Sequence, residues 1–166
     1  ELGAQAPAFF STYEEEGAAG LRVSLRRGWT PPEDFAPVPW CPAGFYVPQG
    51  LRMGKEPLHA AGAYYLQEPS AMAPAAALGV RPGLRVLDLC AAPGGKSTQI
   101  ADLLGGQGIL VANEIHPARA RILLENVERM GVPNAVVCNE TPARIAAHFG
   151  PWFDAVLVDA PCSGEG

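Results

Sequence analysis

The chain has 166 residues, 48% of them hydrophobic and 17% charged, a balance that predicts a folded domain with a buried core and excludes wholesale disorder. Its formal net charge of −5 argues against a nucleic-acid binder with an overall basic face, but it is compatible with an enzyme whose basic surface is local. The four cysteines form no CxxC pair, and no apolar run approaches the roughly 20 residues of a membrane helix, so we expect a cytoplasmic protein without disulfides, a metal site or a membrane span.

Residues 1–58 form a proline-rich N-terminal segment in which few regular elements are expected. The stretch LRVSLRRG at 21–28 alternates well enough to predict a short strand. Residues 29–50 contain too many prolines for a central strand or a helix. The basic cluster of this segment is interpreted either as a phosphate contact or as a solvated strand face, and it consists of Arg22, Arg26 and Arg27.

Residues 59–166 form a second unit, in which strands and helices alternate. A helix is expected near 69–78, then strands at 84–89, 108–114, 135–138 and 153–161 and helices at 95–105, 116–131 and 142–150. Strands separated by helices of about 10–15 residues indicate βαβ units and a parallel sheet. The predicted fold class is therefore α/β.

Two features fall where the strands of such a sheet end, which is where open α/β sheets bind ligands. The turn CAAPGGK at 90–96 follows the first strand, and Glu114 ends the second. Gly94 and Gly95 remove Cβ atoms where backbone must approach a ligand, and the next helix directs its N-terminus there. An acid at the position of Glu114 can accept both hydroxyls of a ribose. Together these features favour a nucleoside ligand.

Two classes of nucleoside ligand compete for this turn. The strings GGKST and AVLVDAP imitate the paired motifs of a P-loop NTPase. However, Cys90 stands where a P-loop needs glycine, and Pro93 lacks the amide that a phosphate cradle uses. S-adenosylmethionine needs only a close turn, a ribose acid and an adenine pocket, so it is the preferred ligand.

The loop DAPCSG at 159–164 adds two candidate catalytic side chains. A thiolate at Cys162 could add to an electrophilic ring carbon, while Asp159 could bond a ring nitrogen or line the cofactor pocket. Cytosine C5 becomes a nucleophile only after a thiolate adds at C6, so a methyltransferase acting there needs such a cysteine. On the chemistry alone, Cys162 would be the nucleophile.

Four stretches resemble the Sun/Fmu family of RNA cytosine-5 methyltransferases, namely YYLQEPSAM, DLCAAPGGKSTQIADLL, ANE and DAPCSGEG. The resemblance is specific over 64–166 and weaker over 21–50. It implies a Rossmann-like S-adenosylmethionine-dependent methyltransferase domain, of which 59–166 is the first, cofactor-binding half, behind a small α+β segment at 1–58 that is a candidate RNA-contacting region. It also implies ribosomal RNA or the small ribosomal subunit as the partner. The implied cofactor residues are Cys90, Ala91, Ala92, Pro93, Gly94, Gly95, Lys96, Glu114, Thr141 and Asp159.

The sequence departs from the family pattern in two places. The family has an acid near the adenine where this chain has Thr141. The family also uses two cysteines, and it implies that Cys162 assists release of the methylated base while the nucleophile comes from a later Thr-Cys motif. The chain contains no Thr-Cys pair, so we expect it to bind cofactor without turning over. The alternative from another class is a non-catalytic module that binds S-adenosylmethionine or RNA.

Overall fold

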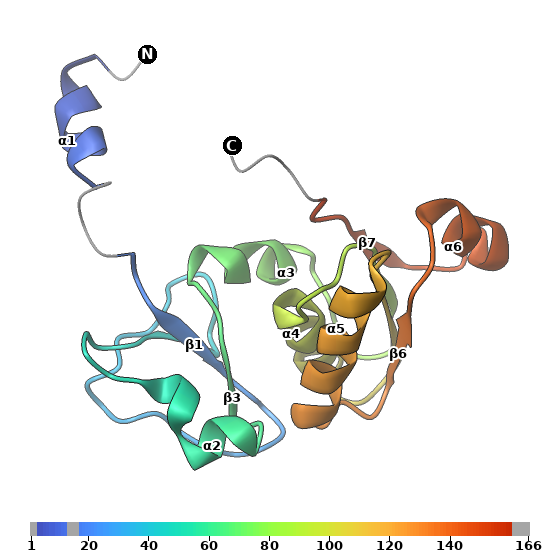
Figure 1. Cartoon of the computed structure of the whole chain (residues 1–166), viewed down its shortest axis with the longest axis horizontal. Coiled ribbons are helices and arrows are strands. Elements are labelled where there is room, and N and C mark those ends of the chain that lie inside the picture. The colour runs from blue at the N-terminus through green and yellow to red at the C-terminus, as the bar shows by residue number, and fades with distance from the viewer. Residues whose placement is uncertain (1–2, 13–16, 161–166) are drawn as a thin grey trace.

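A computed structural model describes residues 3–12 and 17–160, in which two sheets flank a layer of helices (Figure 1). The N-terminal elements are η1 (Gly3–Gln5), α1 (Ala6–Ser11), β1 (Gly20–Val23), β2 (Gly44–Tyr46), η3 (Met53–Lys55), α2 (Pro57–Ala60) and β3 (Tyr64–Leu66). The remaining elements are η4 (Ser70–Met72), α3 (Ala73–Ala77), β4 (Arg85–Asp88), α4 (Gly95–Leu104), β5 (Ile109–Asn113), α5 (Pro117–Arg129), β6 (Ala135–Cys138), α6 (Pro142–Phe149) and β7 (Ala155–Leu157).

The N-terminal sheet is antiparallel, with the strand order β2-β1-β3. Its central strand β1 is the strand expected near 21–28, and Leu21 lies between Phe45 of β2 and Leu66 of β3. The proline-rich residues 29–43 form no strand, and an isolated antiparallel bridge between Pro37 and Phe45 joins them to the edge strand β2. Sequence analysis did not predict β3, whose three residues are too few for a periodic pattern.

The second sheet is parallel, with the strand order β6-β5-β4-β7, which confirms the predicted βαβ arrangement. Its strands alternate between two faces. Val86, Leu110 and Leu157 pack with residues of α3, α4 and α5 on one face. Leu87 and Val111 pack with Ile145 of α6 on the other. This second face is covered only at its centre, since Val136 of β6 and Val156 of β7 are each 46% exposed. The strands are apolar runs that end in polar residues at one edge of the sheet.

The helix expected near 69–78 is split into the 3₁₀ turn η4 and the short helix α3. Pro69 is the N-cap of η4, and Gly79 follows the helix with a φ of +69°. The predicted position is therefore confirmed, with a tighter first turn. In Figure 1 these elements lead the chain from the N-terminal sheet to the parallel one.

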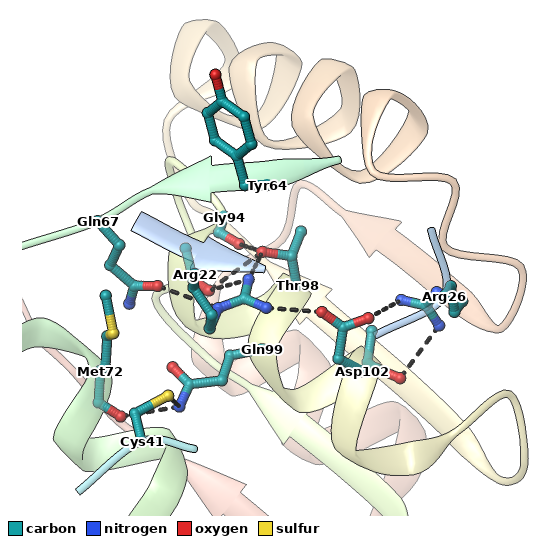
Figure 2. Close-up of polar contacts among 12 residues, drawn as sticks. Arg22, Arg26, Cys41, Tyr64, Gln67, Met72, Gly94, Thr98, Gln99 and Asp102 are labelled. Carbon is teal, nitrogen blue, oxygen red and sulfur yellow. Dashed lines mark hydrogen bonds and ion pairs between the residues drawn. The ribbon is translucent and has the colours of Figure 1, made fainter. Parts of the chain in front are cut away.

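Arg22 of the N-terminal basic cluster is not part of a solvated strand face, because it is only 1% exposed. Its guanidinium points from β1 into α4, where Nη1 lies 2.6 Å from Oδ2 of Asp102 (Figure 2). Arg26 reaches the other oxygen of the same carboxylate at 3.1 Å. The interpretation of Arg22 as a phosphate contact or a solvated residue was therefore wrong. Its partner lies 80 positions along the chain, which no local pattern in the sequence could reveal.

Candidate functional site

The turn between β4 and α4 is held in place by protein contacts on both sides. Gly94 has a φ of +113°, and a Cβ there would lie 3.2 Å from Cδ1 of Leu123. A Cβ on Gly95 would lie 3.3 Å from the side chains of Gln67 and Tyr65. Both glycines thus allow neighbouring elements to pack closely against the turn, and Gly94 also needs the left-handed backbone conformation.

Two neighbouring cavities open along the carboxyl edge of the parallel sheet. The larger, of about 420 Å³, is lined by Leu89, Cys90, Ala92, Asn113, Glu114, Ile115, Arg119, Pro142, Asp159 and Ala160. The smaller, of about 240 Å³, is lined by Tyr65, Leu66, Gln67, Ala71, Asp88, Cys90, Ala91, Ala92, Pro93, Gly95, Lys96 and Asp159. They share Cys90, Ala92 and Asp159, so the turn separates two halves of one hollow.

The structure brings together most of the residues that the sequence predicted for a cofactor. Those that line one or both cavities are Cys90, Ala91, Ala92, Pro93, Gly95, Lys96, Glu114 and Asp159. Gly94 is not a lining residue, because it lies against Leu123. Thr141 is not one either, since its hydroxyl accepts a hydrogen bond from the backbone N–H of Arg144 and caps α6. The neighbouring Pro142 faces the larger cavity instead.

Glu114 is 2% exposed, yet it has polar partners for both carboxylate oxygens. Oε1 accepts a hydrogen bond from the backbone N–H of His116 at 3.0 Å, and Oε2 lies 3.3 Å from Nη1 of Arg119. Carboxylate oxygens can each accept more than one hydrogen bond, so these contacts hold the group in place and leave capacity for a ligand.

Arg119 is a candidate site residue that the sequence analysis did not include. Its side chain lines the larger cavity. Besides contacting Glu114, its Nη2 donates to the carbonyl of Ala92 at 2.9 Å and so ties the turn to the end of β5. The signal that could have found it is its place in the first turn of the helix that follows Glu114.

Lys96 forms a 2.6 Å ion pair with Asp159, across the mouth of the smaller cavity. The two residues come from α4 and from the segment after β7. The Asp159 side chain is 54% exposed, so this pair is accessible to water and weakly stabilising at most. A charged ligand group could therefore replace Lys96 or Asp159 in this ion pair with little loss of free energy.

Asp88 is the most perturbed acid at this edge. It is 1% exposed, and its Oδ2 accepts a hydrogen bond from Ser97 Oγ at 2.7 Å, while Oδ1 has no hydrogen-bond partner among the described residues. Burial raises the pKa of Asp88 to about 6, against the opposing effects of the Ser97 hydrogen bond and Lys96. Asp88 lines the smaller cavity, so a buried carboxylate with one unpartnered oxygen lies at the wall of a space large enough for a ligand.

Cys90 lies in both cavities but is a poor candidate for a nucleophile. Burial raises the pKa of its thiol, and the nearby carboxylate of Glu114 raises it further. A thiol in such surroundings stays protonated near neutral pH. Cys162, the residue that the sequence analysis singled out, lies outside the described residues.

Within the described ranges, no group of three or more His, Cys, Asp or Glu residues could hold a metal ion. No described helix is long and apolar enough to cross a membrane.

Two family models match the chain, and together they account for nearly all of it. The model for 16S rRNA methyltransferase RsmB/F matches residues 75–166, and that for the N-terminal domain of 16S rRNA methyltransferase RsmF matches residues 1–69. The chain belongs to the 16S rRNA methyltransferase RsmB/F family. This finding confirms the resemblance that the sequence motifs indicated, and it excludes the P-loop NTPase alternative.

Curated relatives agree with this family. The chain is 46% identical over 157 residues to ribosomal RNA small subunit methyltransferase F of Vibrio vulnificus, covering 89% of this chain and 32% of that protein. It is 39% identical over 163 residues to the Escherichia coli O157:H7 protein of the same name, covering 94% and 33%. The chain therefore spans about a third of the length of the curated relatives it matches.

Solved structures confirm the fold class. A methyltransferase homolog protein from Pyrococcus horikoshii is 30% identical, with a TM-score of 0.83, over 99% of this chain and 57% of that one. NSun6 from Pyrococcus horikoshii, solved with SFG, is 33% identical, with a TM-score of 0.61, over 68% and 29%. The parallel sheet and its helices thus have the Rossmann-like architecture of S-adenosylmethionine-dependent methyltransferases.

Proposed function

We propose that the protein to which this chain belongs transfers a methyl group from S-adenosylmethionine to C5 of a cytosine in small-subunit ribosomal RNA. In this proposal the chain carries the cofactor site and residues 1–58 contribute to RNA contact. The observation that carries the cofactor assignment is the pair of joined cavities, whose walls combine the turn at 90–96 with Glu114 and Asp159. Family membership supports the reaction and the ribosomal RNA partner.

The residues present fit S-adenosylmethionine in three ways. The buried carboxylate of Glu114 offers acceptors for ribose hydroxyls. Leu89, Ile115 and Pro142 offer apolar surface for an adenine. The carboxylate of Asp88 and the exchangeable Lys96–Asp159 pair line the smaller cavity and offer charges of both signs for an amino-acid group. When bound, the cofactor supplies an electrophilic methyl group.

The chain's own residues bind and orient in this proposal, and the nucleophile lies elsewhere. The raised pKa of the Cys90 thiol argues against covalent attack by that residue. The family resemblance assigns Cys162 to release of the methylated base and the attack to a Thr-Cys motif, of which the 166 residues contain none. We therefore propose that the chain alone binds cofactor without methylating RNA. Cofactor binding without methylation is also what the second candidate function, a non-catalytic cofactor-binding module, predicts.

Calorimetric titration with S-adenosylmethionine, S-adenosylhomocysteine and ATP tests the cofactor assignment. The first two should bind and ATP should not, because no phosphate cradle is present in the turn. Glu114→Ala should weaken binding by about 1–3 kcal/mol, or about 5- to 150-fold, through loss of charge-assisted hydrogen bonds. Glu125→Ala, which removes an exposed acid on α5, is the matched control and should leave affinity unchanged. Equal or tighter binding of ATP would overturn the assignment.

A further inference from the structure

We propose that Arg22 is a positioning residue of the cofactor site, through which the N-terminal sheet holds the turn at 90–96 in its ligand-binding shape. The inference rests on the proposed function, since it takes that turn to bind S-adenosylmethionine. Arg22 lines neither of the two cavities, so it has no direct contact with a ligand bound there. It acts through Thr98, Gly95 and Gln67.

The guanidinium of Arg22 is buried, and one of its nitrogens, Nη2, makes the contacts with the turn and with Thr98. Nη2 donates to Oγ1 of Thr98 at 2.6 Å and to the carbonyl of Gly95 at 3.4 Å. The Thr98 hydroxyl in turn donates to the carbonyl of Gly94 at 2.8 Å (Figure 2). Gly94 and Gly95 are the two residues at which the turn becomes helix α4. A chain of two hydrogen bonds therefore joins strand β1 to the point where the turn closes.

A second contact reaches the wall of the smaller cavity. Nε of Arg22 donates to Oε1 of Gln67 at 3.3 Å, and Nε2 of Gln67 donates to the carbonyl of Ala71 at 2.9 Å. Gln67 lines the smaller cavity beside Tyr65 and Leu66 and lies against Gly95. One guanidinium thus fixes both the turn and the facing wall, which β3 and the residue after it supply.

The energetic setting explains why arginine is needed here. Burial lowers the pKa of Arg22, and the adjacent Asp102 opposes that effect. A charged group with such low exposure is tolerated only when its donors have partners. The planar fork of arginine can reach Asp102, Thr98 and Gln67 at once, whereas the ammonium of lysine is a single point charge. Lysine at this position could keep the ion pair but would lose the contacts with the turn.

Arg26 provides a matched comparison on the same carboxylate. It binds Oδ1 of Asp102 at 3.1 Å and the carbonyl of Ala101 at 3.2 Å, both in the second half of α4. These contacts dock the N-terminal segment on the helix without touching the turn. If Arg22 only docked the segment, loss of either arginine would have the same kind of effect.

The test compares Arg22→Lys and Thr98→Val with Arg26→Ala in the 166-residue chain. Affinity for S-adenosylhomocysteine is measured by calorimetry, and melting temperature is measured alongside. Arg22→Lys and Thr98→Val should weaken binding about tenfold, the effect of about one lost hydrogen bond to a charged group. Arg26→Ala should lower the melting temperature but change affinity less than about twofold, because the polar contacts of Arg26 are with Ala101 and Asp102 and Arg22 keeps its own bonds to Asp102 and the turn. Should Arg22→Lys fail to fold, Thr98→Val carries the comparison.

A ligand-free measurement separates this inference from the proposed function. The amides of Ala91 and Thr98 donate to the carbonyls of Asn113 and Gly94, so their hydrogen exchange reports on the turn. Exchange at these amides should accelerate in Arg22→Lys and not in Arg26→Ala. A wild-type chain that binds neither S-adenosylmethionine nor S-adenosylhomocysteine overturns the proposed function, while the exchange result still decides the role of Arg22. Equal changes in both arginine variants, or none in either, overturn the positioning role.

Discussion

The two sheets contribute to the candidate site in different ways. The parallel sheet presents the ends of its strands, so Asp88, Glu114 and Asp159 reach the hollow by topology alone. The antiparallel sheet has short strands and contributes side chains instead of strand ends. Arg22 of β1 bonds Thr98 beside the turn, and residues 65–67 of β3 and its C-terminal end line the smaller cavity. The first contribution follows from the fold class, whereas the second depends on a few particular contacts between the sheets.

The contacts between the two parts are largely polar and close to the backbone. The apolar cores of the two sheets are separate clusters, one around Leu110 and the other around Leu21 and Tyr64. At the junction, Nη1 of Arg129 donates to the carbonyl of His59 at 2.8 Å. Hydrogen bonds depend on distance and angle more than apolar contacts do. Substitutions at the junction should therefore change the free energy of unfolding by very different amounts, depending on whether they disturb these distances and angles.

The largest effect is expected for Gly62→Ala, which tests how closely the two parts must approach. Gly62 has a φ of +72°, and a Cβ there would lie 2.0 Å from the carbonyl oxygen of Arg129. Because backbone must move, unfolding free energy should fall by about 3–5 kcal/mol. Gly50→Ala is the control, since Gly50 has a φ of +83° with open space around it and should lose only about 1 kcal/mol. Similar losses in denaturant titrations would contradict a tight junction.

The next effect concerns the parallel sheet alone and is measured as a pH dependence. The folded pKa of Asp88 is about 6, above its ordinary 3.8, so between pH 4 and 6 the folded chain keeps a proton that the unfolded chain has released. Stability from this group is therefore highest below pH 4 and falls by about 3 kcal/mol as pH rises to 6. Asp88→Asn cannot ionise, so it should be more stable than wild type at pH 7 by up to that amount.

Thermal melts of Asp88→Asn and wild type from pH 4 to 8 check this prediction. The difference between the two proteins should grow from pH 4 to 6 and then stay constant. Asp34→Asn, at an exposed position in the N-terminal segment, should show no such growth. A constant difference across the whole range would mean that Asp88 is ionised in the folded protein throughout.

Most of the parallel half could be predicted from the sequence because its signals are local. Apolar runs and helices that begin at Pro117 and Pro142 identify the elements. The turn at 90–96 and Glu114 then follow from where parallel strands end. Local signals did not predict the helix-cap role of Thr141, whose hydroxyl accepts a hydrogen bond from the backbone N–H of Arg144.

The N-terminal half resisted prediction because its determinants are distant in sequence. The partners of Arg22 lie 45 to 80 positions away, so its charge suggested a surface role. Helix α4 did carry an unused signal, since its buried face includes Ser97, Thr98, Gln99 and Asp102. So many polar residues beside apolar ones on a buried helix require polar partners from another element.

The smallest effect is expected for loss of the Tyr65 hydroxyl alone, where β3 touches the turn. Its hydroxyl donates to the carbonyl of Pro93 at 3.4 Å, a long hydrogen bond, and that carbonyl also accepts from Nδ2 of Asn126 at 2.9 Å. Tyr65→Phe should therefore cost only about 0.5 kcal/mol of unfolding free energy. Tyr65→Ala removes a ring that is 7% exposed and packs against Gly95, so it should cost about 3–5 kcal/mol. Denaturant titration of both variants measures these two losses. A loss of unfolding free energy above about 2 kcal/mol in Tyr65→Phe would mean that the hydroxyl, and not the ring, holds the N-terminal sheet against the turn.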